Sequence, residues 1–476
     1  MIAIIEIITD SPQLCCIKPL KYYIMKKLLL ASFLMVATSA LFAQSNVSVV
    51  SETGNNNQTT VNQSGLANDS DVSQTGMIGG VGGDDNVATV DQTGDHNSAL
   101  VRTDGDRNTT DLDQVGDNND SEQHQGAGWA EDNMAKSTQL GNGNKSVQKQ
   151  YYDQNNAVIE QTGDNNDAFQ YQSAVNLGPG NDAFAEQYGD DNKSVQKQYG
   201  TLNDANVRQG DHNNDAFQRQ DGNSNYAMSW QNDVSMGFTR GGNKSEQRQT
   251  GDSNIAYVDQ GFGPASNNDA YQEQIGDGNY AWSFQIGDAN MSHSEQTGDN
   301  NTVYEIQEGD NNDSDISQTG DSNTSNTGTV LSPPAAHSSY GQYGNDNSSM
   351  VSQSGDLNES NVYQDGDFNT AGVAQTGDHN QALIMTVGDN NSAMMTSTGD
   401  WNDNLVRQFG DGNSLMADQT GDLNVSTGFQ LSNNNTINST QTGNSNYSYT
   451  RQRITDGHSN TVGQAGNGNS SIVNQQ

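Results

Sequence analysis

Residues 353–380 read QSGDLNESNVYQDGDFNTAGVAQTGDHN, and one unit repeats through this stretch every 11 residues. Each unit begins with Gln, has Gly two residues later and Asp directly after the Gly, and has Asn five residues after the Gln. Five variable residues then lead to the next Gln. Strict tandem repetition of a short unit is typical of solenoid proteins, in which each unit stacks on its neighbours.

The same grid extends from this stretch in both directions. Towards the C-terminus, Thr386 and Ser397 occupy two of the Gln places, and the last unit ends at Gln475. Towards the N-terminus the grid begins at Asn46, with Glu52 in the first Gln place. We count about 37 units between these limits.

The residues between Asn and Gln show the alternation of a strand with one packed face. After Asn358, for example, the inward places hold Ser360, Val362 and Gln364, with mostly polar residues between them. The Gly-Asp-x-Asn segment supplies a tight turn, because Gly and Asn tolerate a left-handed backbone. A helix is excluded by the frequency of Gly and by the lack of a 3.6-residue period.

One strand and one turn form half a coil, so two 11-residue half-units close a coil of 22 residues. We therefore predict an all-β fold, a repetitive parallel β-solenoid of about 18 two-strand coils, on the order of 90 Å long. Asn would stack on Asn and Gln on Gln in amide ladders, as in cross-β fibrils. The ladder residues that we expect are Asn358, Gln364, Asn369, Gln375, Asn380, Gln408, Asn413 and Gln419. The expected turn residues are Gly355, Gly366, Gly377 and Gly388, with Asp356, Asp367, Asp378 and Asp389.

The middle of the chain departs from this pattern in its core. There the fourth residue after the Asn is often Gln, at Gln148, Gln170, Gln196, Gln218 and Gln247. The core of this section is therefore more polar, and we expect it to be the least stable part.

Extra residues interrupt the grid at six places, each between a Gln and the next Asn. They lie near 77–85, 126–132, 175–180, 233–242, 261–267 and 330–341. Insertions confined to one phase of a repeat mark the turns, so we predict protruding turn inserts.

Composition excludes several functional classes. Only 30% of the residues are hydrophobic and the net charge is -40, which is the signature of a disordered chain unless a strict repeat provides order. This charge argues against binding to nucleic acid or anionic lipid, and cations are the natural small partners.

The N-terminal region carries a secretory signal. Met25-Lys26-Lys27 precede the apolar run 28–36, and small residues follow up to Ala43, after which we expect cleavage (Ala40 is the alternative). The run is too short to span a bilayer. Residues 25–43 are thus the expected signal peptide, and 44–476 the expected repeat domain.

Residues 1–24 fit no part of the signal, and we expect translation to start at Met25. The chain's two cysteines, Cys15 and Cys16, lie in this upstream extension. The mature protein would therefore have no disulfide, no Cys-based zinc site and no Cys nucleophile.

These repeats resemble those of the curlin subunits of bacterial curli fibres. The family pattern Ser-x5-Gln-x-Gly-x-x-Asn-x-Ala-x3-Gln is matched by 369–382 (NTAGVAQTGDHNQA) and by 161–168 (QTGDNNDA), and the likeness covers roughly residues 46–476. The resemblance implies a secreted, cell-surface amyloid fibre, export through an outer-membrane pore, and roles in biofilm matrix and adhesion to host or abiotic surfaces. Implied partners are other copies, other curlin-type subunits or a nucleator.

Other chemistry is weakly indicated. Asp299, Asp310 and Asp313 superficially resemble a calcium loop, but Gly is missing from the sixth place and Glu from the twelfth. Solvated turn acids are favoured over weak Ca²⁺ sites, and we expect no cofactor. The pair Asp313 and Asp315 could mimic a glycosidase couple, although such pairs are expected by chance in so acidic a chain. The turn histidines, which have no fixed pattern, are His96, His212 and His379.

The sequence therefore favours a structural subunit that polymerises head to tail, and not an enzyme. The alternative is a monomeric β-solenoid that acts as a surface adhesin or carbohydrate-binding protein. Both terminal units follow the internal pattern with no visible cap, which favours the fibre, because open strand edges invite pairing.

Overall fold

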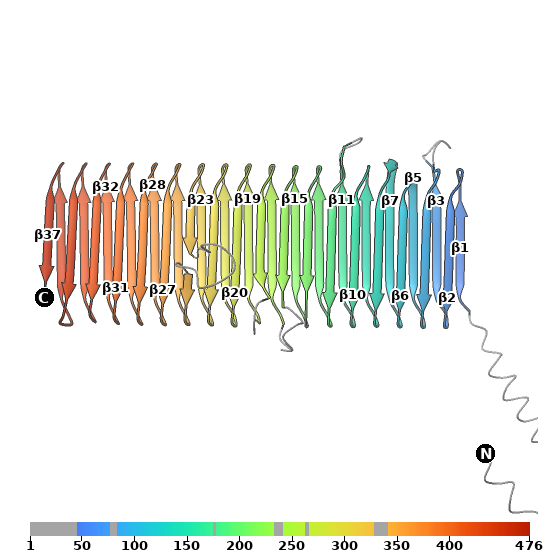
Figure 1. The fold of residues 1–476 in the computed structure, drawn as a ribbon, viewed down its shortest axis with the longest axis horizontal. Coiled ribbons are helices and arrows are strands. Elements are labelled where there is room, and N and C mark those ends of the chain that lie inside the picture. Colours follow the sequence, from blue (N-terminus) through green and yellow to red (C-terminus); the bar gives the residue numbers. More distant parts are fainter. Residues whose placement is uncertain (1–44, 77–82, 175–177, 233–240, 262–265, 328–340) are drawn as a thin grey trace, which may run out of the picture.

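The described part of the chain forms a single stack of flattened coils (Figure 1). This computed structural model describes residues 45–76, 83–174, 178–232, 241–261, 266–327 and 341–476. These residues contain 37 β-strands and no helix. Apart from β24 (Thr324–Thr327) and β25 (Gly341–Tyr343), which share one sheet, consecutive strands alternate between two parallel sheets that face each other across the core.

The two sheets are named A and B. Sheet A has 18 strands: β1 (Val47–Glu52), β3 (Asp69–Thr75), β5 (Ser98–Asp106), β7 (Asp120–Glu131), β9 (Lys145–Tyr151), β11 (Asp167–Ser173), β13 (Lys193–Tyr199), β15 (Asp215–Asp221), β17 (Lys244–Thr250), β19 (Asp269–Ile275), β21 (Met291–Thr297), β23 (Asp313–Thr319), β26 (Ser348–Ser354), β28 (Thr370–Thr376), β30 (Ser392–Thr398), β32 (Ser414–Thr420), β34 (Thr436–Thr442) and β36 (Ser459–Ala465). Sheet B contains β2 (Gln58–Ser64), β4 (Val87–Thr93), β6 (Thr109–Val115), β8 (Met134–Leu140), β10 (Asn156–Thr162), β12 (Asp182–Tyr188), β14 (Asp204–Gln209), β16 (Tyr226–Gln231), β18 (Ile255–Gln260), β20 (Tyr280–Ile286), β22 (Thr302–Glu308), β24 (Thr324–Thr327), β25 (Gly341–Tyr343), β27 (Glu359–Asp365), β29 (Gln381–Val387), β31 (Asp403–Phe409), β33 (Val425–Leu431), β35 (Tyr447–Arg453) and β37 (Ser470–Gln475).

The register between coils follows the repeat. Thr370 of β28 pairs with Ser392 of β30, and Gln375 pairs with Ser397, so residues 22 apart in sequence are neighbours in the sheet. Within each regular strand, buried residues alternate with more exposed ones, as in β28. The prediction of a parallel β-solenoid with 22-residue coils is confirmed.

The turns use a different left-handed residue from the one expected. The variable residue before nearly every Asn has a positive φ, for example 58° at Leu357 and 61° at Trp401, whereas the Asn itself does not. The prediction for the Asn was wrong, because its side chain is turned into the core, where it bonds to neighbouring coils. A bulky residue with positive φ is costly. Here its N–H donates to a carbonyl of the preceding coil, as Leu357 N does to Asp321 O at 2.9 Å, which holds the turn in place.

Glycine at the start of each turn is required for two reasons. Gly377 has a φ of 108°, a region that side chains rarely adopt. A Cβ there would also lie 2.3 Å from the carbonyl oxygen of Gly399 in the next coil. The close stacking of coils therefore explains the regular Gly in the sequence.

The sequence had indicated that the longest insert lies in a turn, and this prediction was wrong. β24 ends at Thr327 and β25 begins at Gly341, yet both strands pair with β22 on one side and with β27 on the other. They are thus two halves of one strand position, and the insert expected near 330–341 interrupts a strand. Spacing alone placed it wrongly, because the Gln that closes this unit, Gln342, follows the insert instead of preceding it.

The remaining inserts are only partly described. Residues within those expected near 77–85, 175–180, 233–242 and 261–267 lie outside the described residues. The insert near 126–132 falls in β7, whose pairing with β5 shifts between Gln125 and Ala130.

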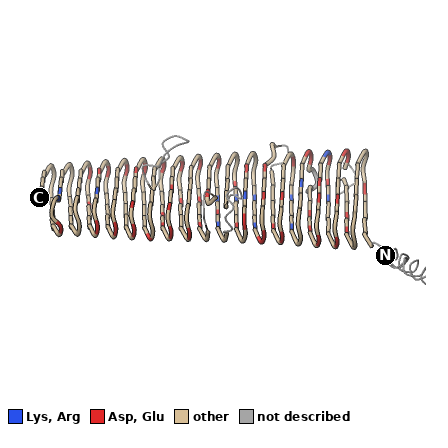
Figure 2. Tube along the Cα trace, turned by 60° about the horizontal axis from the view of Figure 1, so that its bottom comes forward, with Lys and Arg blue, Asp and Glu red and all other residues tan. Residues whose placement is uncertain are grey.

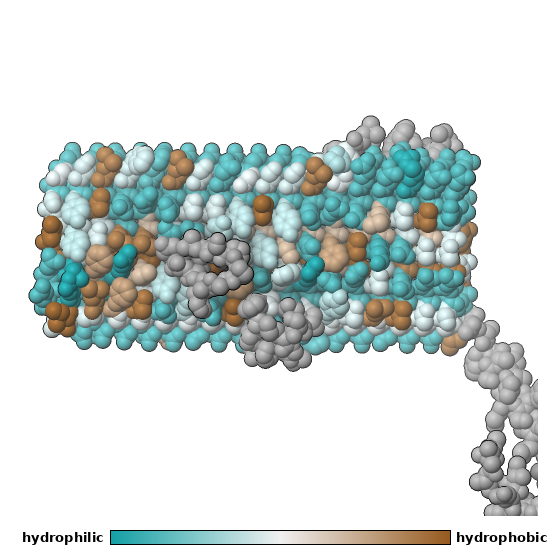
Figure 3. Space-filling view, in the orientation of Figure 1, coloured by the Kyte–Doolittle hydropathy of each residue, from teal (hydrophilic) through white to brown (hydrophobic). Residues whose placement is uncertain are grey.

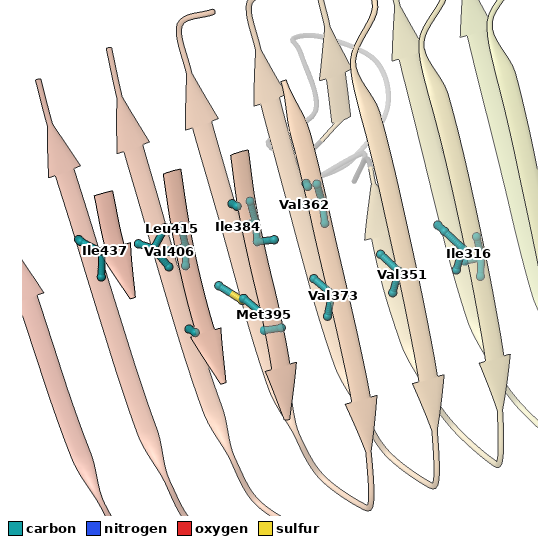
Figure 4. Close-up of a cluster of buried hydrophobic side chains, with 14 residues drawn as sticks. Ile316, Val351, Val362, Val373, Ile384, Met395, Val406, Leu415 and Ile437 are labelled. Carbon is teal, nitrogen blue, oxygen red and sulfur yellow. The ribbon is translucent and has the colours of Figure 1, made fainter. Parts of the chain in front are cut away.

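The space between the sheets is filled by two kinds of side chain. Aliphatic residues form one large cluster in the C-terminal half (Figure 4) and smaller ones near the N-terminus and middle. The rest of the core consists mainly of Asn, Gln, Ser and Thr, most of them almost fully buried, together with scattered small apolar residues and Glu305. The surface is hydrophilic along both turn edges, with apolar residues scattered between them (Figure 3).

Candidate functional site: the amide rows, the turn rims and the two ends

A row of glutamines, interrupted at Thr386, runs along sheet B. The Nε2 of each Gln donates to the Oε1 of the Gln in the next coil, from Gln63 to Gln92 at 2.8 Å through to Gln452 and Gln475 at 2.8 Å. The row also passes through the interrupted strand, since Gln342 accepts from Gln307 and donates to Gln364. Such buried amides avoid the cost of an unpaired polar group.

The row in sheet A has the same geometry. Gln353 donates to Gln375 at 2.9 Å, and Gln419 donates to Gln441 at 3.0 Å. Each Gln also spans the core, as Gln375 does by donating to the carbonyl oxygen of Glu359 at 3.1 Å. The glutamines therefore tie successive coils together and also join the two sheets.

Asparagine forms a second pair of rows at the strand entrances. The backbone N–H of Asn380 donates to Asn358 Oδ1 at 3.0 Å, and Asn380 Nδ2 donates to Gly399 O at 2.8 Å. Asn369 and Asn413 likewise accept backbone N–H groups, from Asn391 and Asn435. All eight residues that the sequence proposed for the ladders are thus less than 2% exposed and lie in these rows.

The rows are broken where the sequence lacks an amide. Thr386 stands between Gln364 and Gln408 in sheet B, and the Oε1 of Gln408 is buried with no hydrogen-bond partner. In sheet A, Ser397 donates to Gln419 at 3.4 Å. These two breaks are adjacent along the chain and fall in the aliphatic part of the core, beside Ile384. A third break lies near the N-terminal end of sheet A, where Thr103 stands between Gln74 and Gln125.

An additional Gln row fills the middle of sheet A. Seven residues make six successive bonds of 2.8–3.1 Å: Gln123, Gln148, Gln170, Gln196, Gln218, Gln247 and Gln272. The facing strands place alanines such as Ala183 and Ala205 opposite, both at most 3% exposed. Gln196 Nε2 reaches the carbonyl oxygen of Ala205 at 2.8 Å. Small residues in one sheet therefore leave room for long amides from the other.

The turn aspartates have a structural role that sequence reasoning missed. The backbone N–H of Asp356 donates to Asp378 Oδ1 at 2.9 Å, and Asp378 N–H donates in the same way to Asp400. On the other edge Asp367 N–H donates to Asp389 Oδ1 at 2.9 Å. The signal was present in the sequence, because Asn, which has the same acceptor, replaces Asp in some turns, such as at Asn444.

These aspartates make both edges of the solenoid acidic. Figure 2 shows Asp and Glu along the turns, whereas Lys and Arg lie mainly on the strands. Carboxylates that belong to one row are about 5 Å apart, because the strand spacing sets the distance between coils. At an effective dielectric between 20 and 80, each such contact costs roughly 1–3 kcal/mol before screening by salt.

The other sequence candidates are not brought together. Asp299 and Asp310 lie in turns at opposite edges, and Asp313 begins β23, so they share no site. Burial, followed by the charge of Asp315, raises the pKa of Asp313. Among the described residues, no group of three or more His, Cys, Asp or Glu side chains could hold a metal.

The turn histidines are equally separate. His379 stacks on Trp401 with ring centroids 4.1 Å apart, and His212 lies 3.6 Å from Asp190. His96 occupies the positive-φ place of its own turn. Each histidine therefore belongs to a different turn, and no catalytic arrangement links them.

Both ends of the stack expose inward-facing residues. Every residue of β1 is exposed, including the inward Val50 at 48%. At the other end, β37 alternates between exposed and intermediate residues where internal strands alternate with buried ones. Gln475, the last Gln of the described row, accepts from Gln452 and is paired on this one side only among the described residues.

The fold and these rows define a tandem-repeat β-solenoid with an amide core. A family model described as the curlin associated repeat matches residues 83–116, 295–320 and 366–399. The chain is therefore a curlin-repeat protein. A comparison with curated proteins gives no match. No helix in the described part of the chain is long and apolar enough to cross a membrane.

Proposed function

We propose that the protein is a secreted structural subunit that assembles head to tail into extracellular, amyloid-like fibres of the curli type. The observation that supports this most directly is the pair of open ends. Two strand edges at each end offer unpaired backbone groups, and the side chains there are of the same kinds as in internal coils. Two different but complementary ends form a heterologous contact that does not close, so assembly is linear.

The internal register specifies how two copies would join. Continuing both sheets places β36 against β1, and β37 against β2, of the next copy. Gln475 then donates to Gln63, and Gln464 to Glu52. An ionised Glu accepts hydrogen bonds but cannot donate, so Glu52 can accept from Gln464 of the preceding copy, although it cannot donate in turn to Gln74 of its own copy. The joint is thus polar, and only head-to-tail pairing satisfies it.

The curlin repeats support a wider role for the fibre. The fibre would contribute to biofilm matrix and to adhesion at host or abiotic surfaces, after export through an outer-membrane pore. Its partners would be further copies and other curlin-type subunits, and the role is structural rather than catalytic.

Electron microscopy of the purified 44–476 chain, incubated at tens of micromolar, tests assembly. We expect unbranched fibres that bind amyloid dyes. A chain that stays monomeric for days with a β-rich spectrum would favour the monomeric adhesin.

Disulfide cross-linking tests the joint. Ser459→Cys and Val47→Cys would place two Cα atoms about 5 Å apart in neighbouring strands, within disulfide range. We expect covalent oligomers in fibres of this double variant. The control pairs Ser459→Cys with Val49→Cys, which is out of register by two residues and beyond disulfide reach. If only the control pair formed a cross-link, the proposed register between copies would be wrong, although the protein would still form fibres.

A further inference from the structure

Glu305 places a carboxyl group inside the stack. It lies on β22, two residues before Gln307 of the sheet B row, and it is 1% exposed. The same place holds Ser283 one coil earlier and Val362 two coils later. A charged group here is costly, because the core offers no solvent to replace its hydration.

Only hydroxyl groups compensate for the burial of Glu305. Ser314 Oγ donates to it at 3.0 Å, and Ser292 Oγ also hydrogen-bonds to it. Burial raises the pKa of Glu305 to about 8, although the two serine hydrogen bonds oppose this shift.

No cation faces Glu305 from the strands around it. The inward residues of its sheet neighbours β20, β24 and β25, and of β21 and β23 across the core, are Ala281, Ser283, Gln285, Ser292, Ser294, Gln296, Ser314, Ile316, Gln318, Ser325, Thr327 and Gln342. The charged or titratable groups of these strands and of β22 point outwards: Tyr280, His293, Glu295, Tyr304, Glu308, Asp313, Asp315 and Tyr343. His293 is engaged with Asp315 at 3.2 Å and Glu295 at 3.3 Å. Asp313 and Asp315 oppose ionisation of Glu305 further.

The neighbouring coil is the one with the interrupted strand. Glu305 pairs with Thr327, the last residue of β24, and pairing on this side resumes only at Gln307 with β25. The hydroxyls of Ser325 and Thr327 are buried and have no hydrogen-bond partner among the described residues. A buried carboxyl group and an incomplete strand thus coincide at one position.

We propose that the coil containing β22 and β24 is a pH-gated breakpoint, which opens locally as the pH rises while coils on either side stay folded. Local opening is possible because each coil of a solenoid contacts only its neighbours. The closed coil holds Glu305 protonated, and the open coil lets it ionise in water. This local opening occurs within a single chain and does not depend on fibre assembly.

The sign of the effect follows from proton linkage. In the open state Glu305 has its ordinary pKa near 4.5, and in the closed state about 8. Between these values the closed state binds one more proton, so its stability falls as the pH rises. The opening constant should increase about tenfold per pH unit in this window and level off above it.

Hydrogen exchange of the monomeric 44–476 chain between about pH 5 and about pH 9, corrected for intrinsic exchange rates, tests the proposal. We expect peptides from β22 and β24 to lose protection about tenfold per pH unit, whereas β13 should show no such dependence. Glu305→Gln and Glu305→Ser should both remove the dependence, since Gln and Ser occupy equivalent places in other coils. The matched control is Glu308→Gln, an exposed residue of the same strand, which should keep it. Identical pH profiles for the wild type and both Glu305 variants would overturn the proposal.

Discussion

Two sections of the solenoid share one backbone but fill it differently. The amide section, from Gln123 to Gln272, carries a second Gln row in sheet A, with a hydrogen bond between each pair of coils. The aliphatic section, from Val303 to Ile437, holds a cluster of 14 buried apolar residues (Figure 4). The turns and the Asn and Gln rows therefore set the geometry of each coil. The other inward places accept either an apolar side chain or a polar one whose hydrogen bonds are satisfied.

The two fillings differ in their expected contribution to stability. Burying an aliphatic side chain contributes about 1.5–3 kcal/mol, whereas a hydrogen bond contributes about 1 kcal/mol net. A buried Gln also loses more rotamer freedom than Val or Ile. We therefore expect the amide section to open more readily, and four predictions bear on this comparison.

The largest effect should come from removing an aliphatic side chain. Ile384→Ala should reduce the local free energy of opening by about 2–5 kcal/mol, because it leaves a cavity beside Met395 and Val406. Hydrogen exchange of β29 measures this loss. Leu383→Ala, on the outer face of the same strand, is the control and should cost much less. Equal losses for the two variants would show that the cluster does not carry the stability of this section.

Breaking the amide row should cost less. Gln196→Leu removes the acceptor of Gln170 and the donor of Gln218, which should cost about 1–3 kcal/mol in the exchange of β13. Lys197→Leu, which faces outwards, is the control. Greater protection in the Gln196 variant would mean that the amide row is kept for register and not for stability.

Completing a broken row should be stabilising. Thr386→Gln would give Gln408 Oε1 its missing donor and Gln364 an acceptor, for a gain of about 1 kcal/mol in coils 381–409. Chemical unfolding followed by exchange measures the change. Destabilisation would indicate that Ile384 and Met395 leave no space for the longer side chain.

The smallest effect on stability is expected at the turn rims. Replacing Asp356, Asp378, Asp400 and Asp422 by Asn keeps each acceptor for a backbone N–H and removes four charges, so stability should change by less than about 0.5 kcal/mol. Fibre assembly should nevertheless begin sooner, because repulsion between acidic rims is reduced.

Dye-monitored assembly at matched ionic strength measures this effect. The wild type should have a shorter lag at about pH 4, or with calcium at about pH 7, than at about pH 7 alone. The Asn variant should respond much less to either change. Equal lag times for the wild type under all three conditions would show that the rims do not govern assembly.

The 11-residue grid was enough to predict the fold and the inward residues. Gln, Asn and the alternating apolar places are local features, so the spacing from Asn358 to Gln364 specifies one strand and one packed face. Glu305 was readable too, since it lies four residues after Asn301, in a place that the other units fill with uncharged residues such as Val, Ile, Ser or Gln. Its surroundings were not, because Ser292 and Ser314 come from the opposite sheet.

What the sequence determined by itself is therefore the period, the strand positions and the kinds of side chain that stack. Only the tertiary structure decided which turn residue is left-handed, that Asp378 accepts a backbone N–H from the coil before it, and that the long insert divides a strand between Thr327 and Gly341. The physical reason is that these features depend on contacts between coils. A spacing within one unit fixes the geometry of that unit, but the bonds between residues 22 apart exist only once the coils have stacked.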